Sequence, residues 1–170
     1  AERCRRARSC GMACLDVIMR LVRPGECVIA GDDLYGGSNR LLELLKKQMH
    51  IEVDNIDTTD LVAVEQALQQ RAKAHAAGEG ARVALVLLES PTNPMIKIAD
   101  LAGCTRLVRK YIPEALVVVD NTMLSPYLMR PLEFGVDIVY HSATKYLSGH
   151  HDILSLRHLS APTRPRLGAS

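Results

Sequence analysis

The chain has 170 residues, of which 48% are hydrophobic and 24% charged, a composition typical of one soluble globular domain rather than a disordered or fibrous protein. Its net charge of +2 is unevenly distributed, because residues 1–9 and 154–170 each carry +3, which leaves −4 for residues 10–153. The basic residues therefore lie at the two ends, and this excludes a nucleic-acid-binding face on the folded body.

Other functional classes are excluded by patterns that the sequence lacks. No apolar run approaches the roughly 20 residues that span a membrane, so we expect no membrane partner and a cytoplasmic protein. The first residue is Ala1, which leaves open a lost targeting segment. The five cysteines form no CxxC pair, and His141, His150 and His151 have no ligand spacing, so we predict reduced thiols and no metal. No GxGxxG follows a predicted strand, which argues against an NAD-binding module.

Helical and strand patterns alternate along the chain, which predicts an α/β fold. The first half is predicted to contain a helix at 12–21, a strand at 27–30, a helix at 39–49, a strand at 51–56 and a helix from the N-cap Thr59 to about residue 75. The second half is predicted to contain strands at 83–88, 116–119 and 137–140 and a helix at 98–110.

The predicted strands at 83–88 and 116–119 are continuous aliphatic runs, as expected of strands that helices cover on both faces. We therefore predict a mostly parallel sheet with helices on both faces, and ligand chemistry at the carboxyl ends of its strands. Residues 1–9 and 154–170 show no helix or strand pattern. We interpret them as non-matching basic tails produced by truncation or a change of reading frame, flanking a domain at 10–153; a disordered extension is the alternative.

Several polar residues follow the predicted strands. Lys145 comes after a strand and after the hydroxyl residues Ser142 and Thr144, which are well placed to bind an anion such as phosphate. A partly desolvated lysine at a strand end can lose its proton and act as an amine nucleophile, although a solvated surface lysine is the simpler interpretation. Asp120 ends a buried strand and so needs a partner or a polar ligand; it is equally plausible as the cap of the following turn.

Two further positions could contact a ligand. Tyr35 lies in a glycine-containing loop and could stack on a flat ring, or it could be a partly exposed turn residue. Gly11 and Met12 begin a predicted helix, where free backbone N–H groups could bind a phosphate.

Taken in order, four motifs resemble the Cys/Met-metabolism family of pyridoxal-phosphate (PLP) enzymes. They are residues 32–40 (DDLYGGSNR), 89–94 (ESPTNP), 119–122 (VDNT) and 141–146 (HSATKY) with Gly149-His150. The resemblance extends from about Gly11 to Ile153, and its last two motifs are highly specific. It implies the fold-type-I, aminotransferase-like large domain, here in truncated form.

The resemblance also implies the roles of individual residues. Lys145 matches the lysine that forms the Schiff base with PLP and shuttles protons, Asp120 the carboxylate on the pyridine nitrogen, and Tyr35 the tyrosine stacked on the ring. Asn93 matches an asparagine near the cofactor hydroxyl. The phosphate would be bound by the residues that match the family's phosphate site, which are Ser142, Thr144, Gly11 and Met12.

The resemblance implies a carbon–sulfur lyase of sulfur amino-acid metabolism that assembles as a homotetramer with shared sites. Residues 36–42 favour cystathionine β-lyase; cystathionine γ-lyase, cystathionine γ-synthase and methionine γ-lyase are the alternatives. The family usually has Ser where Cys10 stands and where His151 stands. An N-terminal arm and a C-terminal domain, which in the family carries the arginine for the substrate carboxylate, have no match here. We therefore expect an inactive or partial fragment, and a non-catalytic remnant is the rival interpretation.

Overall fold

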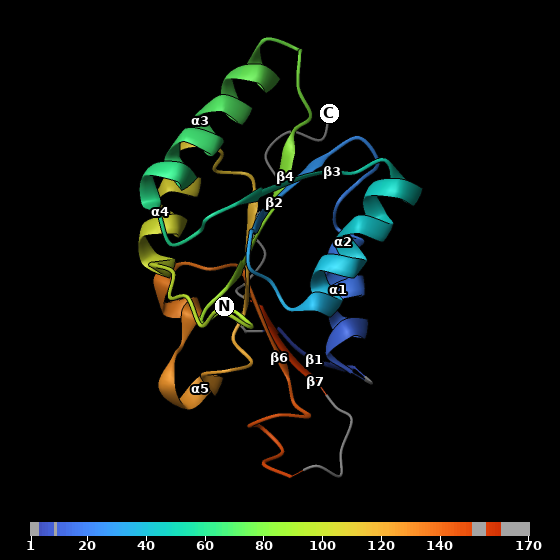
Figure 1. The fold of residues 1–170 in the computed structure, drawn as a ribbon, viewed down its shortest axis with the longest axis vertical. Coiled ribbons are helices and arrows are strands. Elements are labelled where there is room, and N and C mark those ends of the chain that lie inside the picture. The colour runs from blue at the N-terminus through green and yellow to red at the C-terminus, as the bar shows by residue number, and fades with distance from the viewer. Residues whose placement is uncertain (1–3, 9, 151–155, 161–170) are drawn as a thin grey trace.

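The computed structural model of the protein describes residues 4–8, 10–150 and 156–160 (Figure 1). In these residues seven strands alternate with helices in an α/β arrangement, as the sequence predicts. The strands are β1 (Cys4–Arg8), β2 (Cys27–Gly31), β3 (Glu52–Ile56), β4 (Val83–Glu89), β5 (Leu116–Asp120), β6 (Ile138–Ser142) and β7 (Leu156–Ser160). The helices are α1 (Gly11–Met19), α2 (Gly36–Met49), α3 (Leu61–Ala76), α4 (Leu101–Tyr111), the short α5 (Ser125–Leu128) and the 3₁₀ helix η1 (Pro131–Phe134).

All seven strands form one sheet in the order β1-β7-β6-β5-β4-β2-β3. The five central and distal strands, from β6 to β3, pair in parallel, whereas β7 pairs antiparallel with both β6 and β1. The prediction of a mostly parallel sheet is therefore confirmed. Because parallel strands point the same way, the carboxyl ends of β2, β4, β5 and β6 all lie at one end of the sheet, where ligands bind in such folds.

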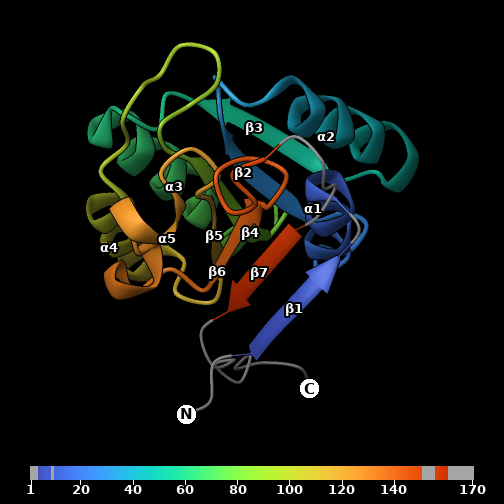
Figure 2. The ribbon, with the colours of Figure 1, turned by 90° about the horizontal axis from the view of Figure 1, so that it is seen from below.

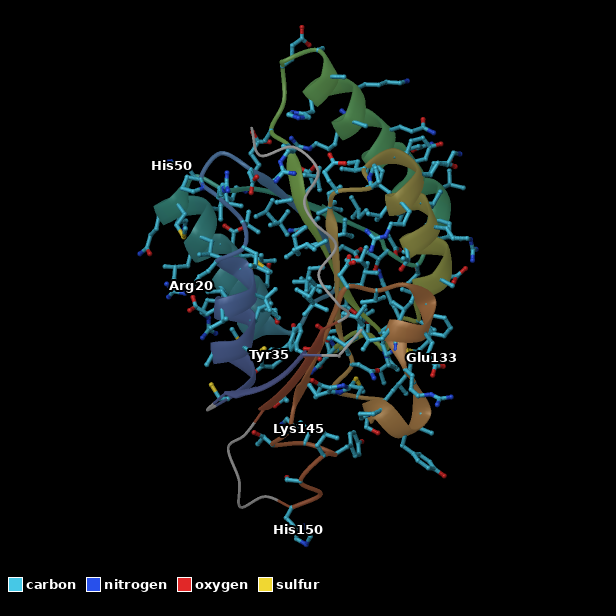
Figure 3. All side chains as sticks on the ribbon, turned by 180° about the vertical axis from the view of Figure 1, so that it is seen from behind. Arg20, Tyr35, His50, Glu133, Lys145 and His150 are labelled. Atoms are coloured by element: carbon cyan, nitrogen blue, oxygen red, sulfur yellow. The ribbon has the colours of Figure 1, made fainter. Side chains whose placement is uncertain are left out.

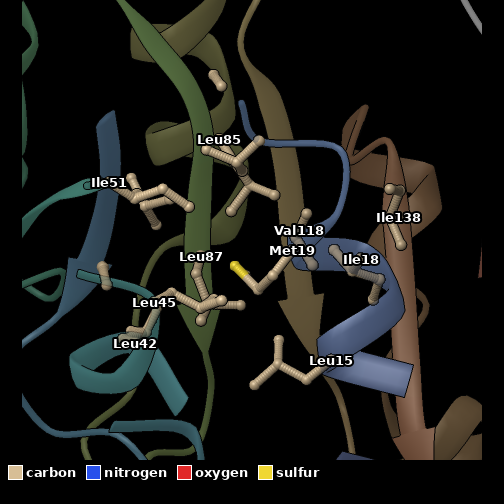
Figure 4. Packing of buried hydrophobic residues seen from close by; sticks show 14 of the residues in the cluster. Leu15, Ile18, Met19, Leu42, Leu45, Ile51, Leu85, Leu87, Val118 and Ile138 are labelled. Atoms are coloured by element: carbon tan, nitrogen blue, oxygen red, sulfur yellow. The ribbon is translucent and has the colours of Figure 1, made fainter. Parts of the chain in front are cut away.

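Helices cover both faces of the sheet, with α1 and α2 on one face and α3 and α4 on the other (Figure 1). Alternate residues of one strand enter different cores: Val28 packs with α1 and α2, whereas its neighbour Ile29 packs with α3 and α4. In the first core, Met19 of α1 lies beside Leu87 of β4 and Val118 of β5 (Figure 4). Burial on both faces explains why these strands are continuous aliphatic runs rather than alternating ones.

Several helix boundaries differ from the sequence-based prediction. The helix α2 begins at Gly36 rather than at residue 39, which makes Tyr35 its N-cap. The helix α3 is capped by Asp60 and not by Thr59, because the Asp60 side chain accepts a hydrogen bond from the Val62 N–H, whereas the Thr59 hydroxyl donates to Asp57. Short polar residues next to one another compete for the same capping position, and sequence alone does not rank them.

The prediction that the two ends of the chain contain no strand is wrong for residues 4–8 and 156–160. Strand β7 lies between β6 and β1, and Cys4 pairs with Ser160 at one end of the β1–β7 ladder (Figure 2). Neither segment has the alternating hydrophobic pattern of a half-buried strand. Their pairing therefore depends on the backbone hydrogen-bonding groups along the open edge of β6, on which β7 and then β1 pair. The remaining residues of both predicted tails lie outside the described residues.

Candidate functional site

Three neighbouring parallel strands carry polar side chains in register at or near their carboxyl ends. Glu89 of β4 pairs with Asp120 of β5, and Asp120 pairs with Tyr140 of β6. In-register residues on adjacent strands project their side chains to the same face of a sheet. Two carboxyl groups and a phenol thus meet at the carboxyl-terminal edge, where the sequence predicts ligand chemistry.

The Asp120 carboxylate is held by the segments that follow β5 and β6. It accepts hydrogen bonds from the Thr122 backbone N–H at 2.9 Å and from the Thr122 hydroxyl, and the Tyr140 hydroxyl lies within hydrogen-bonding reach. Thr122 Oγ1 in turn accepts from the Ser142 N–H at 2.8 Å. Burial raises the pKa of Asp120 above its ordinary value, and the hydrogen bonds from Thr122 partly oppose that rise.

The Glu89 side chain is 6% exposed and lies directly beside Asp120. It accepts hydrogen bonds from the backbone N–H of Tyr35, at 3.0 Å, and from the backbone N–H of Asn93. Burial raises the pKa of Glu89 to about 7, and the negative charges of Asp120 and Asp33 add to this rise. Glu89 therefore changes its charge in the neutral pH range.

Within the described residues, no lysine or arginine forms an ion pair with Glu89 or Asp120. Two carboxyl groups, the buried Glu89 and the partly buried Asp120, without a paired cation make this end of the sheet favourable for a ligand that brings a positive charge or an N–H donor. A protonated pyridine nitrogen is such a group, so the two carboxyl groups fit PLP.

Four of the residues predicted to contact the cofactor lie at the starts of α1 and α2 and the end of β6. The start of α1 lies against the end of β6, because a Cβ added at Gly11 would lie 3.3 Å from the Cβ of Ser142. Gly37, at the start of α2, lies between two others: a Cβ there would lie 2.8 Å from the sulfur of Met12 and 2.5 Å from the ring of Tyr35. The Tyr35 side chain is 49% exposed, which leaves one side of its ring free for a ligand.

Lys145 and Thr144 lie in the turn that follows β6. The Lys145 N–H donates to the Ser142 carbonyl at 3.1 Å, and the Lys145 carbonyl accepts from the Gly149 N–H at 3.1 Å, so the backbone of the turn is tied. The Lys145 side chain is exposed, which agrees with the simpler of the two interpretations from sequence and not with a partly desolvated lysine. Lys145 and Tyr35 nevertheless lie toward the same end of the molecule, whereas His50 lies at the other (Figure 3).

The structure also identifies residues that the sequence analysis did not select as site residues. Glu89 and Thr122 were noted only as parts of motifs, yet they contact Tyr35, Asn93, Asp120 and Ser142. The signal that could have found Glu89 is its position as the last residue of an otherwise aliphatic strand. Burying a carboxylate there is costly unless other groups form hydrogen bonds with it. In the described part of the chain, no group of three His, Cys, Asp or Glu side chains could hold a metal ion.

Comparisons with known proteins agree with this arrangement. The family model described as "Cys/Met metabolism PLP-dependent enzyme" matches residues 1–155, and so includes residues 1–9. The chain is 50% identical over 155 residues to cystathionine beta-lyase of Neurospora crassa, covering 91% of this chain and 31% of that protein. It is 51% identical over 144 residues to cystathionine beta-lyase of Schizosaccharomyces pombe, covering 85% of this chain and 34% of the other. Cystathionine gamma-lyase of Bacillus subtilis is 38% identical over 148 residues, which cover 87% of this chain and 36% of that one.

Solved structures share the fold. A crystal structure of cystathionine gamma synthase from Xanthomonas oryzae pv. oryzae superposes with a TM-score of 0.82 at 36% identity, covering 94% of this chain and 38% of that one. The chain thus spans about a third of the length of the curated relatives that it matches.

We predict that the free energy of unfolding of this chain falls as pH rises, because of Glu89. Its pKa is about 7 in the folded chain against 4.5 for an ordinary glutamate, so between these values the folded state holds a proton that the unfolded state has lost. The contribution of Glu89 to the free energy of unfolding is fully present below pH 4.5 and is lost as pH rises to about 7, a total of about 3 kcal/mol. Urea unfolding at a series of pH values measures this slope.

The Glu89→Gln chain is the control, because it has no proton to lose and the slope in that window should flatten. A slope that Glu89→Gln leaves unchanged would show that another group causes it.

Proposed function

Since the chain belongs to the Cys/Met metabolism family of PLP-dependent enzymes, we propose that it forms the cofactor-binding part of a carbon–sulfur lyase that acts on cystathionine. The observation that carries this proposal is the pair of carboxyl groups, the buried Glu89 and the partly buried Asp120, that meet without a cation among the described residues. The chain covers about a third of its curated relatives, so the activity proposed is that of a lyase of the relatives' full length.

Each predicted site residue has a distinct task in this proposal. Asp120 would hold a proton on the pyridine nitrogen of PLP, aided by its hydrogen bonds from Thr122. Tyr35 would stack on the ring through its exposed side. The phosphate would be bound at the junction of α1 and β6, by the N–H groups of Gly11 and Met12 and the hydroxyls of Ser142 and Thr144.

The chemistry of the reaction divides between cofactor and protein. When bound, PLP draws electrons from the substrate carbon and so makes its α-proton acidic. The amine of Lys145 would join the cofactor to the chain and, when released from it, accept that proton. Because Lys145 is exposed at a turn, its side chain is free to reach both the cofactor and the substrate. Asn93, whose backbone is held by Glu89, would contact the cofactor hydroxyl.

We favour the β-lyase reaction, in which cystathionine gives homocysteine, pyruvate and ammonia. Two fungal proteins named cystathionine beta-lyase are 50% and 51% identical to this chain, against 38% for the Bacillus subtilis gamma-lyase. The γ-lyase reaction, which gives cysteine, 2-oxobutanoate and ammonia, is the second candidate.

We also propose a partner and a location for the protein. Exposed apolar side chains near the site end, among them Tyr127, Tyr146 and Met95, favour contact with a second copy of the protein. Among the described residues no helix has the length and hydrophobicity to cross a bilayer. We propose a cytoplasmic homo-oligomer, and note that two plant relatives are named chloroplastic.

We predict that PLP binds covalently at Lys145. The chain is incubated with PLP and reduced with borohydride, and the labelled peptide is identified by mass spectrometry. Lys145→Ala should lose the label, because Lys145 directly follows Ser142 and Thr144, whereas Lys97 in the loop after β4 is paired with Asp32 and Asp57. Lys110→Ala is the matched control, since Lys110 pairs with Glu65 on the surface and should not matter. Label that stays in the Lys145→Ala chain would refute this assignment.

We predict that the reaction, measured with PLP and cystathionine, releases pyruvate in excess over 2-oxobutanoate. The rate should be far below that of a complete lyase, because the family resemblance puts the arginine for the substrate carboxylate outside this third of the protein, and lost positioning is costly. The Lys145→Ala chain gives the background rate. An excess of 2-oxobutanoate above that background would contradict the β-lyase proposal and support the γ-lyase.

A further inference from the structure

We propose that Glu89 is a positioning residue that fixes Tyr35 and Asn93 in place next to Asp120, by accepting hydrogen bonds from the backbone N–H groups of both. The proposal rests on the proposed function, which gives Tyr35 and Asn93 their contacts with PLP. Glu89 itself touches neither cofactor nor substrate in this account, and acts through the two residues that do.

The geometry that supports the proposal joins three separate parts of the chain. Glu89 is the last residue of β4, Tyr35 precedes α2, and Asn93 lies in the loop after β4. The distance from the Tyr35 nitrogen to Glu89 Oε2 is 3.0 Å. Because Glu89 is also the in-register neighbour of Asp120, one carboxyl group sets the distances among the three predicted cofactor contacts.

The loop after β2, which carries Tyr35, and the loop after β4, which carries Asn93, are also joined to each other directly. Asp33 Oδ2 accepts hydrogen bonds from the Thr92 hydroxyl and from the Met95 N–H, the latter at 3.1 Å. Asp33 and Glu89 therefore both connect the same two loops through hydrogen bonds. The Glu89 carboxyl is the more buried of the two, because Asp33 is partly exposed, so a change of charge at Glu89 acts more strongly on the N–H groups that it binds.

The surroundings of Glu89 allow its charge to change near neutral pH. The charged and titratable groups that act on it are Asp120 in β5 and Asp33 in the loop after β2, with Tyr140 of β6 next in line. Burial and these negative charges put the pKa of Glu89 at about 7. When the proton leaves, both N–H bonds become charge-assisted and therefore stronger at the same pH.

A carboxylate at the other end of the sheet provides the contrast. Asp137 accepts the Val117 N–H at 2.7 Å, and it pairs with Arg109. It too is a side chain that ties backbone segments together, but a cation compensates its charge and no predicted site residue contacts it. Asp137 thus represents a purely structural carboxylate.

The test is a pH titration of the cofactor-free chain followed by two-dimensional ¹H–¹⁵N NMR. We expect the amide signals of Tyr35 and Asn93 to move together, with one shared midpoint near pH 7. Glu89→Gln should abolish this shared step and speed hydrogen exchange at both amides. Asp137→Asn should leave the step unchanged. Separate midpoints for the two amides, or a step that survives in Glu89→Gln, would overturn the proposal.

A second variant keeps the test decisive if Glu89→Gln does not fold. Asp33→Asn removes one of the negative charges that raise the Glu89 pKa, so the shared midpoint should shift to lower pH while the two amides still move together. A midpoint that stays in place would count against Glu89 as the titrating group. Because no cofactor is present, these results are independent of PLP binding: co-titration without any label at Lys145 would keep the positioning role and refute the proposed function.

Discussion

The structure depends on two carboxyl groups, the buried Glu89 and the partly buried Asp120, that lie side by side at the ends of parallel strands. Glu89 and Asp120 are in register on β4 and β5, and the strands around them are aliphatic on both faces. Such burial disfavours the charged forms, as the raised pKa values of both groups indicate. The neighbouring loops supply N–H and hydroxyl donors that partly offset this cost, and those same loops carry the residues predicted to bind the cofactor.

The need of these two carboxyl groups for hydrogen-bond donors explains why residues far apart in sequence meet at the carboxyl ends of the strands. Thr122 donates to Asp120 and accepts from the Ser142 N–H, so the segment after β5 connects Asp120 to the end of β6. Glu89 does the same for the loops that carry Tyr35 and Asn93. The site is thus organised by side chains that bond to backbone, and a cationic ring nitrogen would relieve the remaining excess of negative charge.

The strands that carry the site could be predicted from sequence, because burial on both faces leaves continuous runs such as 83–88 and 116–119. The position of Asp120 after a strand followed from the run at 116–119, and that of Lys145 from the predicted strand at 137–140. The contacts of Glu89 could not be predicted, since its two partners are 54 residues before it and four residues after it, and only the folded loops bring them together. The strands at 4–8 and 156–160 escaped prediction because edge pairing requires no sequence period of its own.

The most direct test of the account is the affinity of the chain for PLP when Asp120 is replaced. If the Asp120 carboxylate holds the ring nitrogen, Asp120→Asn removes a charge-assisted hydrogen bond of about 1.5–3 kcal/mol, which weakens binding by about tenfold or more. Asp137→Asn, at the opposite end of the sheet, should leave the Kd for PLP unchanged. The account predicts this difference in equilibrium titrations at neutral pH. A Kd for Asp120→Asn equal to that of the unaltered chain would contradict it.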